Sequence, residues 1–79
     1  MKNSVRPLYE IANEIKKDWN NIYFGAEPYL NAMLTLTTIN DSYGLDDAKS
    51  IVLYFLANAS TWRGETARNV KKELKELCK

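Results

Sequence analysis

The feature that most constrains this chain of 79 residues is the spacing of apolar side chains in its last third. Five of these side chains recur at steps of three and four residues: Trp62, Thr66, Val70, Leu74 and Leu77. Such steps place side chains on one face of a helix with about 3.6 residues per turn. A helix with a single apolar face needs a partner for that face. The spacing therefore predicts a helix over residues 61–78, capped by Ser60 or Thr61, that packs on the upstream chain.

The first upstream partner is an apolar stripe near the N-terminus. Its members are Leu8, Ile11, Ala12, Ile15 and Trp19. Ser4 has a side chain able to cap free backbone N–H groups, and the missing N–H of Pro7 costs little in a first turn. Gly25 is a residue at which a helix readily ends. We expect a helix over residues 5–21.

A second helix is predicted over residues 27–38. Glu27 matches the positive end of the helix dipole, and Pro28 has its φ angle already set for a first turn. The same segment contains β-branched threonines near its end, which lose side-chain freedom in a helix. A strand over residues 34–39 is therefore the competing interpretation. The turn formers of residues 40–44, which include Gly44, predict a loop.

A third helix is predicted over residues 46–58, with Asp46 as its N-cap. Its centre, residues 51–57, is apolar all round, which is typical of a helix buried among others. A buried strand fits the same run, but length and the N-cap favour a helix. The four predicted helices make one all-α domain, a compact bundle of four short helices over residues 1–79.

Composition limits the environment in which this chain works. Hydrophobic residues make up 46% and charged residues 27%, close to the globular average. Cys78 is the one cysteine, so an internal disulfide is impossible and a reducing cytoplasm is expected. The N-terminal residues lack the apolar run of a secretory signal, and the longest apolar run, residues 51–57, is short for a membrane span. We expect a cytoplasmic protein without membrane contact.

Catalytic chemistry has little support in the sequence. The chain contains no histidine, which removes the most frequent general base and zinc ligand. Glu10, Glu14 and Asp18 stand four residues apart as an acidic ridge on the first predicted helix, and we interpret them as solvated surface groups. No glycine-rich phosphate loop or calcium loop is present. The prediction is a protein that is not an enzyme and that has no cofactor or metal ion.

The last predicted helix raises the possibility of nucleic-acid binding. Five basic side chains are candidates for phosphate contacts: Arg63, Arg68, Lys71, Lys72 and Lys75. Glu65, Glu73 and Glu76 lie among them. Three acid–base pairs fall at helical spacing, namely Glu65–Arg68, Lys72–Glu76 and Glu76–Lys79, which favours a self-neutralising solvent face. The net charge of the chain is only +1. A small DNA-binding regulator is therefore the alternative function, with nucleic acid as the less favoured partner.

Aromatic residues and an arginine at the ends of the predicted helices form the candidate protein-binding surface. Its members are Trp19, Tyr23, Phe24, Trp62 and Arg63. Trp, Tyr and Arg are the residues preferred at the centres of protein interfaces. A tryptophan at a helix start beside a turn more often closes the end of a bundle, so a structural role is favoured for Trp62, and the two roles are compatible. The prediction is a non-enzymatic protein-interaction module.

Residues 23–33 and 43–75 carry a resemblance. The segments YFGAEPYLNAM and YGLDDAKSIVLYFLANASTWRGETARNVKKELK are similar to those of small helical proteins of bacteriophages, prophages and other bacterial mobile elements. The resemblance implies an accessory protein that binds a host or phage component or forms a homodimer. It brings no catalytic or binding residues with it.

Overall fold

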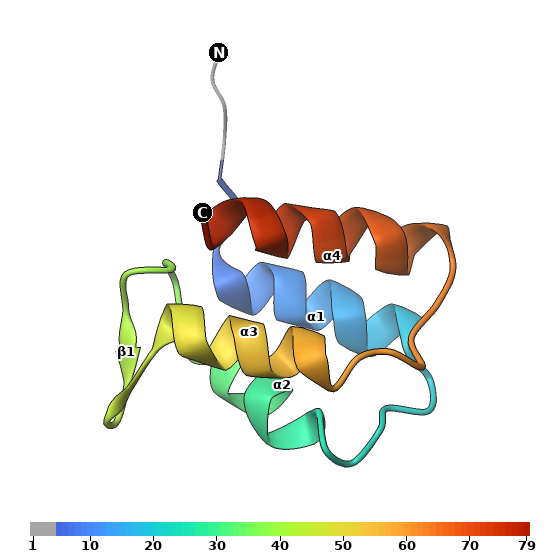
Figure 1. Ribbon diagram of the computed structural model, residues 1–79, viewed down its shortest axis with the longest axis horizontal. Coiled ribbons are helices and arrows are strands. Elements are labelled where there is room, and N and C mark those ends of the chain that lie inside the picture. The colour runs from blue at the N-terminus through green and yellow to red at the C-terminus, as the bar shows by residue number, and fades with distance from the viewer. Residues whose placement is uncertain (1–4) are drawn as a thin grey trace.

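The structure is a computed structural model that describes residues 5–79. These residues form four helices, namely α1 (Leu8–Asp18), α2 (Glu27–Met33), α3 (Ala48–Ala57) and α4 (Glu65–Leu77). A short hairpin joins β1 (Ser42–Tyr43) to β2 (Asp46–Asp47). α4 lies beside α1 and α3, and α2 packs against α1 and α3 at the opposite edge of the molecule (Figure 1). The fold is mostly helical, and the hairpin corrects the prediction of a purely all-α bundle.

α1 buries the predicted stripe but is shorter than residues 5–21 at both ends. Pro7 is its N-cap and has no side-chain capping bond, while the predicted cap, Ser4, lies outside the described residues. The backbone N–H groups of Leu8 and Tyr9 donate instead to the carbonyls of residues 37 and 36, both at 2.9 Å. The helix ends at Asp18, and Trp19 follows in an extended conformation with its side chain buried in the core.

α2 begins at Glu27 as predicted but ends at Met33, five residues before the predicted end. The Thr35 hydroxyl donates to the carbonyl of Ala32 at 2.8 Å. The carboxylate of Asp41 accepts from the backbone N–H groups of Thr37 and Thr38 at 2.9 and 3.1 Å. The threonines therefore form turns, and both predictions for this stretch, a helix to residue 38 and a strand over 34–39, are wrong. In this stretch, hydrogen bonds to side-chain hydroxyls and carboxylates take the place of the backbone hydrogen bonds that a helix or a strand would form.

The hairpin occupies part of the predicted loop. Ser42 pairs with Asp47 and Tyr43 with Asp46 in an antiparallel register, across a two-residue turn that begins with Gly44 at φ +63°. Asp46 therefore belongs to β2, which corrects its predicted role as a helix cap. The N-cap of α3 is Asp47, whose side chain accepts from the backbone N–H of Ser50 at 2.8 Å.

α3 is a helix, which decides between the two interpretations of residues 51–57. It is not, however, surrounded by other helices. Ile51, Val52 and Phe55 are buried, whereas Leu53 and Tyr54 are 46% and 50% exposed. A helix packed on only some of its sides leaves the remaining apolar residues in contact with solvent. The apolar run therefore supplies both the core and an exposed surface.

α4 begins three residues after Trp62 and not at residue 61. Its N-cap is Gly64 at φ +114°, since neither Ser60 nor Thr61 caps it. Val70 and Leu74 are buried as predicted, and Ala67 is buried where Thr66 was expected. Trp62 packs in the core from the segment that precedes the helix. No helix of residues 5–79 has the length and apolar character needed to cross a membrane.

Candidate interaction surfaces

The predicted protein-binding set divides between the core and the surface. Trp19 and Trp62 are only 6% and 2% exposed, and their rings stack with centroids 5.7 Å apart. Phe55 packs edge-on against both rings, at 6.2 and 6.4 Å. Both tryptophans are thus structural, and neither is available to a partner. The exposed members of the set are Tyr23, Phe24 and Arg63.

Polar bonds fix Trp62 in place. Its Nε1–H donates to the carboxylate of Asp18 at 2.8 Å. Its backbone carbonyl accepts from Lys71 Nζ at 2.7 Å, and the same ammonium lies 5.9 Å from the centroid of the indole ring. These contacts tie the end of α1 and the middle of α4 to the segment between α3 and α4. Asp18 is exposed, as predicted for a surface group, and it also has a structural role through its bond to Trp62.

The corner between α1 and α2 presents two aromatic rings. Tyr23 and Phe24 lie 4.9 Å apart between centroids, and Phe24 is 76% exposed. Gly25 makes this arrangement possible, because a Cβ at this position would lie 2.5 Å from the Tyr23 ring and 3.0 Å from Asn58 Oδ1. The backbone conformation at this corner therefore depends on Gly25, and it leaves the large apolar side chain of Phe24 exposed to water.

A second aromatic pair continues this corner along the boundary of α2 and α3. The rings of Tyr29 and Tyr54 lie 5.4 Å apart. Asn58 joins the two pairs, since it approaches Gly25 and donates to the carbonyl of Tyr54 at 2.9 Å. We define the aromatic surface as Tyr23, Phe24, Tyr29 and Tyr54. Sequence reasoning missed the last two, although the all-round apolar character of residues 51–57 was a signal that some of them had to be exposed.

The charges of α4 separate onto two flanks of the helix. Arg68, Lys71, Lys72 and Lys75, at positions i, i+3, i+4 and i+7, line one open depression of about 470 Å³ together with Asn69. We call these four cations the basic stripe. Of the three acid–base pairs expected to neutralise this helix, only the Glu76–Lys79 pair forms, at 3.1 Å. The prediction of a self-neutralising face is therefore wrong for the basic stripe.

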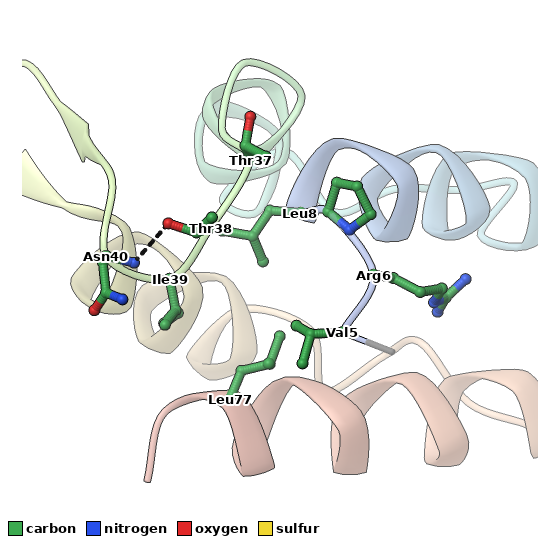
Figure 2. A pocket seen from close by; sticks show the side chains of 9 residues that line it. Val5, Arg6, Leu8, Thr37, Thr38, Ile39, Asn40 and Leu77 are labelled. Carbon is green, nitrogen blue, oxygen red and sulfur yellow. Dashed lines mark hydrogen bonds between the residues drawn. The ribbon is translucent and has the colours of Figure 1, made fainter. Parts of the chain in front are cut away.

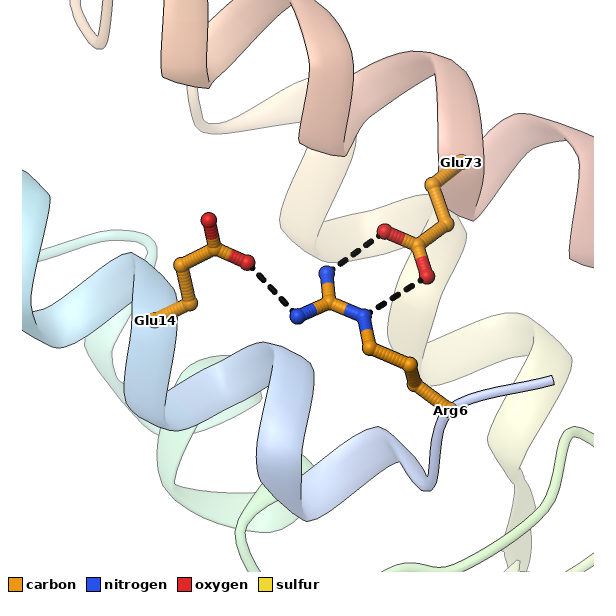
Figure 3. Close-up of polar contacts among 3 residues, drawn as sticks. All are labelled: Arg6, Glu14 and Glu73. Atoms are coloured by element: carbon orange, nitrogen blue, oxygen red, sulfur yellow. Dashed lines mark hydrogen bonds and ion pairs between the residues drawn. The ribbon is translucent and has the colours of Figure 1, made fainter. Parts of the chain in front are cut away.

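Arg6 unites the N-terminal segment with two helices. Its guanidinium holds both carboxylate oxygens of Glu73 on α4, at 3.0 and 2.6 Å, and reaches Glu14 on α1 at 2.8 Å (Figure 3). The bond to Glu73 is the main cause that raises the pKa of Arg6 above its ordinary value. Glu14 is therefore a structural partner and not a free member of an acidic ridge. Glu10, the third member, is exposed.

An apolar pocket of about 340 Å³ lies between the N-terminal segment, the turn before the hairpin and the end of α4 (Figure 2). Its apolar lining comes from Val5, Pro7, Leu8, Ile39 and Leu77, and its polar lining from Arg6, Thr37, Thr38 and Asn40. Arg6 directs its charge to the two glutamates. The pocket therefore has room for an apolar group beside two hydroxyls and an amide.

The remaining reactive groups do not converge. Among residues 5–79, no three Cys, Asp or Glu side chains are placed to hold a metal ion. Cys78 is half-buried, and burial raises the pKa of its thiol, which keeps the sulfur protonated and a weak nucleophile. The features that stand out are the aromatic surface and the basic stripe. Comparison of the chain with protein-family models, curated proteins and solved structures found no match.

Proposed function

We propose that this protein is a non-enzymatic protein-interaction module that binds a different protein through the aromatic surface. The observation that carries the proposal is Phe24, which is 76% exposed on a corner that Gly25 makes possible. Water contact with so large an apolar side chain is unfavourable by roughly 2 kcal/mol relative to its burial. A partner that covers Phe24 recovers this free energy. The proposed localisation is the reducing cytoplasm, where a lone cysteine stays unpaired.

The composition of the aromatic surface defines the chemistry of the partner. All four of its members are aromatic, and none carries a charged side chain at neutral pH. We therefore expect a partner that covers this surface with an apolar patch. The resemblance to proteins of phages and mobile elements favours a partner that belongs to the host or to the element.

Photo-crosslinking tests this proposal directly. Benzoylphenylalanine replaces Phe24 in the full chain, which is produced in the cells from which it comes, and adducts are identified by mass spectrometry. Tyr9 is the control, because it is an exposed aromatic residue, 43% exposed, that lies near the other end of α1. We expect an adduct with one defined protein at position 24 and none at position 9. The added variant Tyr54→Ser should remove that adduct while leaving the melting temperature unchanged within about 2 °C.

Three outcomes would overturn the proposal. Equal adducts from positions 9 and 24 would show capture by chance collision. An adduct with the mass of two copies of this chain would replace the heterologous partner with a homodimer. Absence of any adduct at position 24, in cells where the protein is folded and present, would leave the aromatic surface without a partner.

A further inference from the structure

The basic stripe has an electrostatic environment that the net charge of the chain conceals. Two of the three acidic groups of α4 have partners outside the stripe, since Glu73 is bound to Arg6 and Glu76 is paired with Lys79, while Glu65 lies exposed in the first turn. None of the ion pairs found within residues 5–79 involves a member of the stripe. The four cations therefore share one face of the helix without forming an ion pair, and Lys71 also donates to the carbonyl of Trp62.

A further cation, Arg63, lies near the stripe. Burial lowers the pKa of Lys71, and the positive charges of Lys75 and Arg63 lower it further. On the neighbouring helix, Lys49 of α3 lies close enough to the end of α4 to influence the Cys78 thiol. Like charges held together by a fold repel one another, and an anion that binds among them removes that repulsion.

We propose that the basic stripe binds the phosphate backbone of double-stranded DNA. The stripe runs from Arg68 to Lys75, roughly 10 Å along the helix axis at about 1.5 Å per residue. One DNA strand carries a phosphate about every 3.4 Å of axis, so this length matches roughly three phosphates. Binding is independent of base sequence, because the stripe consists of long cationic side chains that reach phosphate oxygens. This surface is separate from the aromatic surface and does not rest on the protein-interaction proposal.

The composition of the depression favours DNA over a membrane surface. Its lining is Arg68, Asn69, Lys71, Lys72 and Lys75, which are all polar. Helices that lie on membranes insert an apolar face beside their cationic one. The apolar face of α4, with Ala67, Val70 and Leu74, is buried in the core. The cations of α4 can therefore attract an anionic membrane surface, but the helix has no exposed apolar face to insert into it.

The test is the salt dependence of binding to a labelled duplex of about 20 base pairs, long enough for several phosphate contacts. Fluorescence anisotropy gives the binding constant of the full chain between about 50 and 200 mM salt. For the wild type, the logarithm of this constant should fall against the logarithm of the salt concentration with a slope of roughly −3, the value for about three phosphate contacts. The fluorescence of Trp62, which lies beside Lys71, should change with the same midpoint.

Two double variants with the same net charge separate a local site from a general charge effect. Lys72→Ala with Lys75→Ala removes half of the stripe, and Lys16→Ala with Lys17→Ala removes two exposed cations from α1. At about 50 mM salt, the α4 variant should bind at least about tenfold more weakly and its slope should become shallower by roughly 2. The α1 variant should stay within about twofold of the wild type. Circular dichroism melts confirm that both variants remain folded.

The following results would overturn the proposal. Equal weakening by the two double variants would show that only net charge matters. No binding of the wild type at the lowest salt concentration would remove the site. Binding to anionic lipid vesicles without binding to the duplex would assign the stripe to a membrane surface.

Discussion

Two glycines hold backbone conformations that other residues adopt only at a cost. Gly64, the N-cap of α4, has φ +114° and ψ −179°, a region that is almost restricted to glycine. Gly44, in the hairpin turn, has φ +63°, where asparagine is also tolerated. A Cβ at either position would meet nothing within 4 Å. The requirement for glycine is therefore conformational and not steric.

Replacement of these glycines should give different results. Gly64→Ala and Gly64→Asn should each lower the free energy of unfolding by roughly 1–3 kcal/mol, because no side chain relieves the strain at this φ and ψ. Gly44→Asn, the control, should change it by less than about 0.5 kcal/mol. Urea denaturation followed by circular dichroism measures all three. A Gly64→Asn variant as stable as the wild type would show that α4 starts with another backbone geometry.

The two tryptophans show why single residues were hard to assign from sequence. The tryptophan side chain suits a protein interface as well as a core, so the sequence allowed both roles for Trp19 and Trp62. The stacking of Trp19 on Trp62 depends on segments that are 43 positions apart in the chain, and local sequence does not encode their meeting. Phe24 was predicted as part of the surface set and is exposed. The tertiary packing thus separated residues of one chemical class into two roles.

At the scale of the elements, helix ends differ most from their predicted positions. The first N–H groups of α1 are satisfied by carbonyls of residues 36 and 37, which no local capping pattern reveals. α3, by contrast, begins at an aspartate as predicted, although one residue later than Asp46. Hydrogen bonds from the hydroxyl and the backbone N–H of Ser50 hold the pKa of Asp47 below its usual range. Bonds from Thr37 and Thr38 lower the pKa of Asp41 in the same way.

The lowered pKa values give the fold a sensitivity to acid. Since the pKa of each carboxyl is lower in the folded than in the unfolded state, their contribution to stability is complete above the unfolded value, about 3.9. The contribution is lost as the pH falls through the lower, folded value. Asp47→Asn should therefore show a smaller loss of unfolding free energy below about pH 4 than the wild type. Urea titrations at a series of pH values measure this difference, and identical acid profiles would show that the cap is not formed in solution.

At the scale of the whole molecule, Arg6 connects three parts of the chain. The bidentate bond to Glu73 and the ion pair with Glu14 join the N-terminal segment, α4 and α1. About a third of each of the Arg6 and Glu73 side chains remains exposed, so solvent screens the attraction. The network therefore contributes modestly to stability, but it sets how α1 and α4 lie against each other.

Removal of this network should have a measurable and salt-dependent effect. Arg6→Ala should lower the free energy of unfolding by about 1 kcal/mol at low salt and by less at high salt. Arg6→Lys should recover little of this loss, because an ammonium lacks the two parallel donors of the guanidinium. Glu76→Ala, which breaks the exposed pair with Lys79, is the control and should change stability by less than about 0.5 kcal/mol. Full recovery by Arg6→Lys would show that only charge, and not the bidentate geometry, matters.

The sequence by itself determined that four segments are helical and which face of α1 is buried. Leu8, Ile11, Ala12 and Ile15 follow a helical period, and this period is a local property that survives in any packing. It also located the polar turn around Gly44, whose positive φ was expected. Where apolar residues follow a clear helical spacing, the position of a helix and its buried face can therefore be predicted largely from the local sequence.

Only the tertiary structure decided where the helices end and which aromatic and charged residues face solvent. α2 stops at Met33 because the following residues bond to α1 and to Asp41, and Tyr54 is exposed because no helix covers that side of α3. Glu73 of α4 is bound to Arg6, 67 positions away in the chain, and none of the ion pairs within residues 5–79 includes a member of the basic stripe. Such outcomes depend on contacts between distant residues, and both proposed binding surfaces arise from them.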